Sequence, residues 1–173
     1  MAIFKIEKNE QYTLLGILQY IVDMERHQGR VEFYSTCGAD SRTPLRDMML
    51  VKLLCNKTGG TQYKQAMLSL TDSESTDENI DVFNLLAWHV ARYICQYTQC
   101  QVAFAVHSNT DNLHAHFIIN SVRLDNGYKI QIGWRDLFQM KKGINDFLEA
   151  FSFKLIKYND FEKEKVCNDH SPG

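Results

Sequence analysis

The sequence predicts an α+β fold, with a central antiparallel β-sheet of about five strands flanked by helices. Apolar residues recur at helical spacing in some segments and form short strand-like runs in others. The turn sequence Asp125-Asn126-Gly127 predicts that the runs on either side of it form a hairpin. The chain has 173 residues, of which 45% are hydrophobic, so it can build one core. Antiparallel strands that carry helices are typical of the α+β class.

The first half of the chain predicts two strands and two helices. Residues 2–7 alternate weakly and predict a strand, while residues 10–25 carry a helical stripe of apolar side chains. Thr43-Pro44 predicts the start of a helix with proline in its first position, and this helix stops near Thr58-Gly59-Gly60. Residues 62–70 predict the second strand.

The second half predicts three further strands between two long helices. Ser75 and Glu78 have the spacing of a capping box, and the helix that follows them begins near Ile80. The remaining elements that we expect are strands at 101–108, 114–122 and 128–132, the last two forming the hairpin, and a helix over 134–158. We expect one domain over 1–158 and a charged, disordered tail over 159–173.

Composition narrows the classes of function. The net charge of −2 does not by itself indicate a nucleic-acid binder, and no apolar run is long enough to span a membrane. The five cysteines include no CxxC pair and the N-terminus lacks the features of a signal peptide, so we expect reduced thiols in the cytoplasm. Basic residues nevertheless flank the glycine turn and the predicted hairpin, namely Lys57, Lys64, Arg123 and Lys129.

Three of the six histidines fall within ten residues, at His107, His114 and His116. Residues two apart on a strand share a face, so His114 and His116 point the same way, as does the polar Asn120. Imidazole is the commonest metal ligand among side chains, and His107 can complete a trio from a neighbouring strand. The alternative is that the pair consists of two unrelated side chains.

A metal on three neutral histidines keeps open coordination positions. A closed structural zinc site usually includes cysteine, and none lies between residues 101 and 166. The predicted site is therefore catalytic, and phosphoryl chemistry suits the basic residues nearby. The nucleophile is either water or a side chain, and Tyr20 on the first helix is the candidate side chain. The alternative for Tyr20 is a boundary tyrosine that packs its ring and bonds through its hydroxyl.

Several ordered segments of the chain resemble the motifs of one known family. Residues 18–21, which include Tyr20, resemble its first motif; residues 35–38, 48–52 and 56–60 resemble its connecting segment; residues 62–70 resemble its second motif; and residues 105–122 resemble its third, the histidine triad. The family is the relaxase domain of mobilisable and conjugative plasmids and elements, the MobP-type members of the HUH endonucleases. The resemblance spans about residues 1–155.

The resemblance implies a reaction and its parts. His107, His114 and His116 would bind one divalent ion, Mg²⁺ or Mn²⁺, that grips the scissile phosphate. Tyr20 would attack single-stranded or hairpin-flanked origin-of-transfer DNA, forming a 5′-phosphotyrosine link and a free 3′-OH that can later be rejoined. Lys57, Lys64, Arg123 and Lys129 would contact phosphates. Accessory relaxosome proteins and a coupling protein are the expected protein partners.

Two positions depart from the family pattern. Gln65 stands where many relatives carry histidine, and Asn109 stands where aspartate is common, although Asp111 is retained. Either Asp111 or Glu74 is expected to orient a histidine or to accept the tyrosine proton.

Three alternatives to a relaxase remain. A rolling-circle replication initiator shares the fold, but such initiators more often place the tyrosine after the histidines. A metal-dependent hydrolase would use water as its nucleophile. A DNA-binding module with a degenerate site would bind without cutting.

Overall fold

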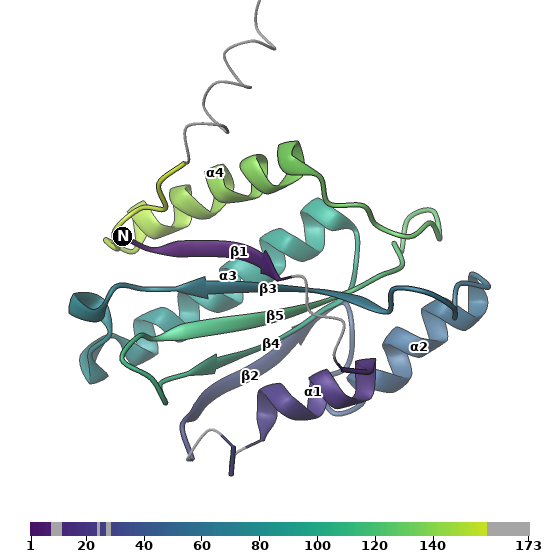
Figure 1. Ribbon diagram of the computed structural model, residues 1–173, viewed down its shortest axis with the longest axis horizontal. Helices are drawn as coiled ribbons and strands as arrows, with labels where there is room; N and C mark the ends of the chain where they lie inside the picture. Colours follow the sequence, from purple (N-terminus) through teal and green to yellow (C-terminus); the bar gives the residue numbers. More distant parts are fainter. Residues whose placement is uncertain (8–11, 24, 27–28, 159–173) are drawn as a thin grey trace, which may run out of the picture.

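The computed structural model describes residues 1–7, 12–23, 25–26 and 29–158 of the chain. It contains one five-stranded antiparallel sheet, with the strand order β1-β3-β5-β4-β2, and helices on both faces (Figure 1). The elements in chain order are β1 (Ile3–Glu7), α1 (Leu14–Val22), β2 (Val31–Cys37), α2 (Pro44–Leu54), β3 (Tyr63–Ser69), η1 (Asp72–Glu74), η2 (Asp77–Asn79), α3 (Ile80–Thr98), β4 (Val102–His107), β5 (His114–Asn120) and α4 (Trp134–Ala150). The α+β prediction is confirmed, and the predicted tail at 159–173 lies outside the described residues.

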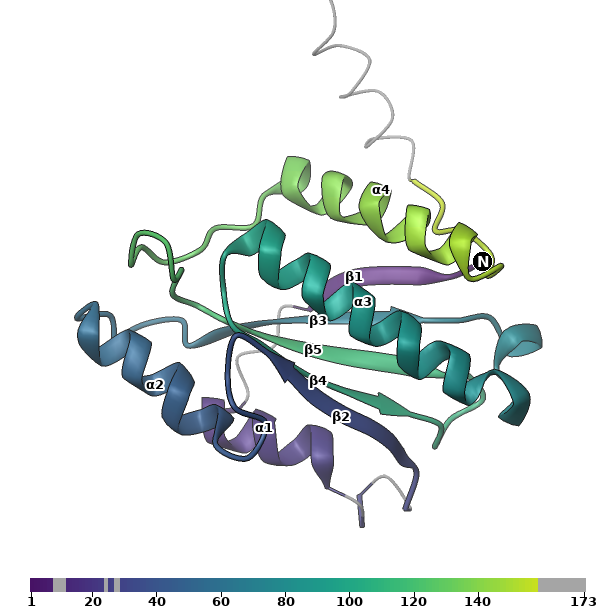
Figure 2. The ribbon, with the colours of Figure 1, turned by 180° about the vertical axis from the view of Figure 1, so that it is seen from behind.

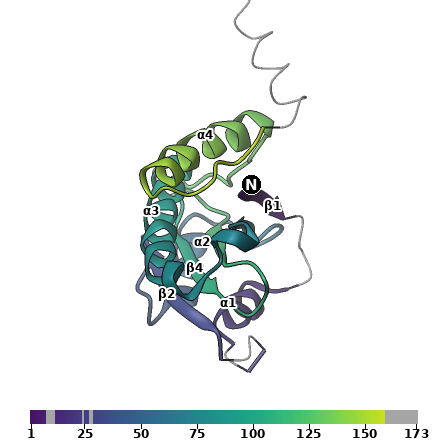
Figure 3. The ribbon, with the colours of Figure 1, turned by 90° about the vertical axis from the view of Figure 1, so that its left-hand side faces the viewer.

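The two faces of the sheet are covered to different extents. Helices α3 and α4 pack on one face over the larger core, which includes Phe104 and Phe117 (Figure 2). Helix α1 packs on the other face, against β2, β4 and β5, over a smaller core around Ala105 and Ile118. Figure 3 shows α3 and α1 on opposite sides of the sheet. No helix within the described part of the chain is both long and apolar enough to cross a bilayer.

The prediction of a strand at 128–132 is wrong, although the count of five strands is correct. Only an isolated bridge between Val122 and Lys129 forms there. β5 already pairs with β3 on one side and with β4 on the other, so a returning segment can bond only to the chain beyond Asn120. The predicted hairpin is therefore reduced to a turn.

The fifth strand is β2, which the sequence prediction missed. β2 is an edge strand that pairs only with β4, and its register shifts between Val31 and Phe33. Such an irregularity interrupts the two-residue alternation by which a strand is recognised. The residues on either side of it pack on different faces although they are two apart, Val31 against the smaller core and Phe33 against the larger one.

The capping box also lies elsewhere than predicted. The structure places it at Thr71 and Glu74 of η1, whereas Ser75 donates its hydroxyl to the carbonyl of Thr71 and accepts from the backbone of Leu113. Helices α1 and α4 are shorter than the predicted ranges 10–25 and 134–158. Thr13 caps α1 by accepting a 3.1 Å bond from the backbone nitrogen of Gly16.

A buried lysine ties α2 to the sheet at the end of β5. Lys52 is fully buried, and its Nζ donates to the carbonyl of Gln62 at 2.7 Å and to Oδ1 of Asn120 at 2.5 Å. The Asn120 amide in turn donates to the carbonyl of Met48 and to the side chain of Gln101. Burial, and after it the charge of Lys129, lowers the pKa of Lys52 to about 8.

Replacing Lys52 with Met tests this network through its pH dependence. Below pH 8 the ammonium is charged in both the folded and the unfolded chain, so its burial costs stability in full. Above pH 8 the folded chain releases the proton before the unfolded chain does, so stability rises until the unfolded pKa of about 10.5 is reached. We expect the unfolding free energy of the wild type, measured by urea denaturation, to rise relative to Lys52→Met between pH 8 and 10. A constant difference across that range would contradict the assignment.

Candidate metal centre and active site

Three histidines lie together on the face of the sheet that carries α1. His107 pairs directly with His114 across β4 and β5, and His116 follows two residues along β5 on the same face. The ring centroids are 5.2 to 5.3 Å apart, and one ligand nitrogen from each ring lies within 4.8 Å of the others. The three rings predicted from the sequence are therefore brought together, each with at most 9% of its surface exposed.

Backbone carbonyls orient two of these rings. His107 Nε2 lies 2.7 Å from the carbonyl oxygen of Ile21, to which it donates, so a metal would be bound through Nδ1. His114 Nδ1 donates to the carbonyl of Asn112 at 2.9 Å, which leaves Nε2 as its ligand nitrogen. Metal-binding histidines are commonly held in this way, with one nitrogen donating to an oxygen and the other on the ion.

Gln65 holds the third ring. The Gln65 Nε2 atom lies 3.1 Å from His116 Nδ1, and Gln65 is only 3% exposed. As placed, the amide nitrogen faces the ring and the buried Oε1 accepts no hydrogen bond. Turning the amide over lets Oε1 accept from Nδ1–H, which satisfies both groups and directs Nε2 of His116 toward the cluster. Gln65 pairs with Ile118, which follows His116 by two residues on β5. Gln65 is therefore the diagonal neighbour of His116 on the same face of the sheet.

The arrangement fits a single metal ion. Ligand nitrogens lie about 2.0–2.3 Å from such an ion, so binding requires the three rings to turn until their nitrogens, now within 4.8 Å of one another, reach that distance. Among the residues that the structure describes, no carboxylate or thiol belongs to the cluster. Three neutral ligands on one side leave the remaining coordination positions open for substrate oxygens.

Tyr20 lies beside the cluster. The centroid of its ring lies 6.4 Å from that of the His116 ring, with the two rings edge to face. Tyr20 is half-buried on α1 and precedes Ile21, whose carbonyl accepts the hydrogen bond from His107. The Tyr12 ring stacks on it at 5.6 Å, and the Arg26 guanidinium lies 5.4 Å from its centroid. The phenol ring therefore lies between apolar side chains and the histidine cluster.

The two candidate carboxylates differ in what they bind. Glu74 accepts hydrogen bonds from the Thr71 hydroxyl and from the backbone of Lys154, both at 2.5 Å. Burial alone would raise the pKa of Glu74, but these hydrogen bonds lower it on balance. Asp111 is exposed in the loop between β4 and β5, three residues before His114. The Glu74 carboxylate is thus engaged by Thr71 and Lys154, whereas Asp111 is open to solvent.

The four basic residues lie toward the opposite end of β5 from His114, and even Lys64, which pairs with Ile119 three residues beyond His116, is roughly 10 Å from that histidine along the strand. Arg123 is paired with Asp125 at 2.7 Å, and Lys129 donates to the carbonyls of Gly59 and Thr61. Lys64 shares the sheet face of Ala66 and Leu68, which is the α3 and α4 side and not the histidine side. The structure therefore separates Lys64, Arg123 and Lys129 from the histidine cluster, and it also separates Lys57, which follows α2. Asn120 likewise lies outside the cluster, because its side chain belongs to the Lys52 network.

Comparisons with known proteins agree with this geometry. The family model described as "Relaxase: MobA/VirD2-like, nuclease domain" matches residues 20–152. No curated protein matches the chain. A solved structure described as "Molecular Basis of Vancomycin Resistance Transfer in Staphylococcus aureus" has a TM-score of 0.62 and 16% identity, and the match covers 91% of this chain and 100% of that one.

A second similar structure is the MobM relaxase domain (MOBV; Mob_Pre), bound to plasmid pMV158 oriT DNA in an Mn-bound crystal structure at pH 6.8. Its TM-score is 0.60 with 10% identity, over 95% of this chain and 98% of that one. At these identities the two structures support the shared fold, and the family model supports the assignment by sequence. The chain belongs to the MobA/VirD2-like family of relaxases, whose shared region is a DNA nuclease domain of the HUH type.

Proposed function

We propose that this chain nicks single-stranded origin-of-transfer DNA by transesterification, with Tyr20 as the nucleophile, and so initiates conjugative transfer or mobilisation. The observation that carries the proposal is a phenol on α1 next to three histidines whose ligand nitrogens converge. The DNA-bound MobM relaxase domain of the same fold supports DNA as the substrate.

The histidines would hold the ion through His107 Nδ1, His114 Nε2 and His116 Nε2. The bound ion supplies Lewis acidity toward the non-bridging oxygens of the scissile phosphate. The carbonyls of Ile21 and Asn112 and the amide of Gln65 keep the rings aimed at that position, so no reorganisation is needed when charge develops there.

Tyr20 would form the new bond. Its phenol oxygen attacks phosphorus while the bond from phosphorus to the 3′-oxygen breaks in line with it, and the leaving 3′-oxygen takes a proton from solvent water to become the free hydroxyl. The phenol proton passes to a base, for which Asp111 is the candidate because Glu74 is bound to Thr71 and Lys154. One phosphoester replaces another, so the same groups can rejoin the strand.

Three imidazole ligands favour Mn²⁺ over Mg²⁺ as the ion. Mg²⁺ prefers oxygen ligands and retains its water, whereas nitrogen donors bind first-row transition ions more strongly. Lys57, Arg123 and Lys129 would then contact phosphates away from the scissile one, given their distance from the cluster, whereas Lys64, on the opposite face of the sheet, would not. Accessory proteins and a coupling protein would bring the DNA to the site.

A covalent-capture experiment tests the nucleophile. The chain is incubated with a random-sequence pool of labelled single-stranded DNA and Mn²⁺, and adducts are separated on a denaturing gel. We expect a protein–DNA adduct that maps to Tyr20 by mass spectrometry and that Tyr20→Phe abolishes, because the phenol oxygen forms the link. Tyr128→Phe, at an exposed tyrosine, is the matched control and should retain the adduct. Cleavage by Tyr20→Phe without any adduct would instead support a hydrolase that uses water.

Metal affinity tests the orienting role of Gln65. We expect Gln65→Leu to weaken Mn²⁺ binding about 10- to 100-fold in calorimetry, because His116 loses the acceptor that fixes its ring. Gln65→Glu keeps an acceptor oxygen and should bind at least as well as the wild type. His114→Ala, which removes a ligand, should lose most of the affinity, and Mg²⁺ should bind more weakly than Mn²⁺ throughout. Unchanged affinity in Gln65→Leu, with the fold intact by circular dichroism, would refute the role.

A further inference from the structure

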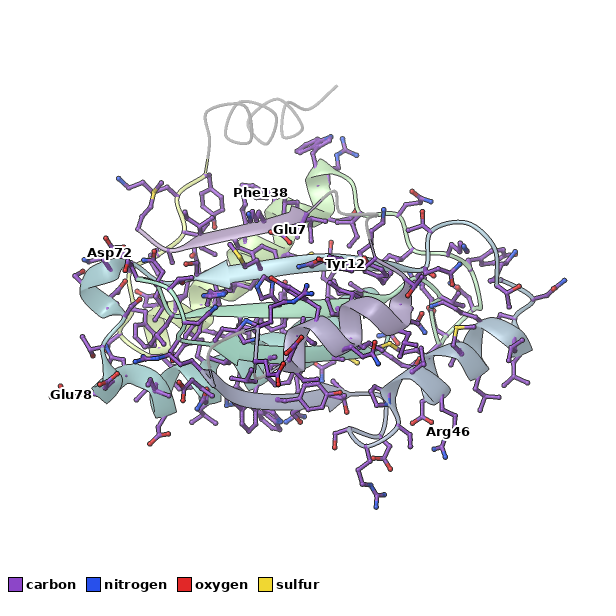
Figure 4. The ribbon with its side chains drawn as sticks, turned by 60° about the horizontal axis from the view of Figure 1, so that its bottom comes forward. Glu7, Tyr12, Arg46, Asp72, Glu78 and Phe138 are labelled. Atoms are coloured by element: carbon purple, nitrogen blue, oxygen red, sulfur yellow. The ribbon has the colours of Figure 1, made fainter. Side chains whose placement is uncertain are left out.

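A pocket of about 500 Å³ opens at the end of the sheet beside the histidines. It is formed by four separate segments: the start of β1, the end of β3 with the turn after it, the loop before β5, and the segment after α4. Its lining includes Met1, Ile3, Leu70, Ser73, Asn112 and Lys154. Figure 4 labels Asp72, which also lines it, at this end of the molecule. The volume is in the range of small-ligand sites.

Paired residues of neighbouring strands lead from the histidine cluster to the pocket. His107 pairs with His114, His114 with Ser69, and Ser69 with Ile3, so these four side chains form one row across β4, β5, β3 and β1 on the same face. Ser69 and Ile3 both line the pocket. Asn112 belongs to both sites, because its carbonyl orients His114 while its side chain lies in the pocket wall.

Tyr20 and the pocket lie on different sides of the cluster. Helix α1 covers β2, β4 and β5, whereas the pocket lies over the ends of β3 and β1. In an in-line displacement the leaving oxygen departs on the side of phosphorus opposite the attacking one. If Tyr20 attacks as proposed above, the leaving nucleotide, which ends in the new 3′-OH, extends toward the pocket.

The chemistry of the lining suits a nucleoside more than a bare phosphate. The Lys154 ammonium donates to Ser73 at 2.8 Å, and the Asp72 carboxylate accepts from the Asn112 amide at 2.5 Å, so both charged side chains are engaged within the pocket wall. The apolar side chains of Ile3 and Leu70 offer a surface for a planar base. Hydroxyl and amide groups at the rim can bond to base edges or sugar.

We propose that this pocket binds the nucleotide immediately 5′ of the scissile phosphate, with its base against Ile3 and its backbone near Lys154. This assignment rests on the proposed function, because it takes its direction from attack by Tyr20. It makes the pocket a specificity site, which reads one base and retains the 3′-OH end for rejoining.

Abasic scanning of a captured substrate tests the proposal. Sequencing the covalent adducts identifies a DNA sequence and its nick, and oligonucleotides are then made with one abasic residue at each flanking position. We expect the abasic residue just 5′ of the nick to lower the rate of adduct formation about tenfold or more, and the effect to be smaller two or more residues further upstream. Ile3→Trp, which fills the pocket, should lower the rate on intact DNA and abolish the difference between intact and abasic DNA.

Matched variants control for structural effects. Leu85→Trp, at a leucine of similar exposure on α3 behind the sheet, should keep the wild-type discrimination. Lys154→Ala should raise KM several-fold with little change in kcat, whereas Lys157→Ala, which removes the same charge three residues away, should not. Adduct formation on intact DNA with no sensitivity to the 5′ abasic residue, or with unchanged sensitivity in Ile3→Trp, overturns the pocket assignment alone. If the wild type forms no adduct at all, the proposed function fails and the assignment fails with it.

Discussion

The pairing of His107 with His114 across β4 and β5 is the constraint on which the site depends. The two-residue period of a strand places His116 on the same face, so one correct register assembles all three rings. A slip by one residue would turn His114 and His116 into the opposite core. The stacked rings of Phe104 and Phe117, which also pair across these strands, oppose such a slip because they would leave their own core. The histidine cluster is thus stabilised by hydrophobic packing on the far face of the same strands.

Helix α1 links Tyr20, the proposed nucleophile, to the three histidines. Two consecutive residues of α1 contact the histidines: the Tyr20 ring packs against His116, and the carbonyl of Ile21 accepts a hydrogen bond from His107. The helix is fixed by its buried stripe and by the Thr13 cap. A shift of α1 would therefore move the phenol and release a histidine ring at the same time. This coupling explains how a phenol on a short helix can be held in register with ligands on the sheet.

The sequence predicts the local features of the site better than the long-range ones. The histidine triad depends on a two-residue spacing and on adjacent strands, and Tyr20 lies in a short segment that resembles the family's first motif, so both are visible in short segments. The strand at 128–132 was predicted wrongly because no local pattern shows that both edges of β5 are already paired. The roles of Lys129 and Lys52 depend on oxygen atoms far away in the sequence, those of Thr61 and Asn120 respectively. The pocket, built from four segments, has no local signature, and Gln65 stood out only as a departure from the family pattern.

A crystal structure of the protein soaked with Mn²⁺, with anomalous scattering data, tests the central claim most directly. The account predicts one anomalous peak within about 2.3 Å of His107 Nδ1, His114 Nε2 and His116 Nε2, with the Tyr20 hydroxyl directed toward its open side. It also predicts the Gln65 amide oxygen, not its nitrogen, against His116. A peak bound by other residues, the absence of a peak at saturating Mn²⁺, or a Tyr20 phenol turned away from the cluster would contradict it.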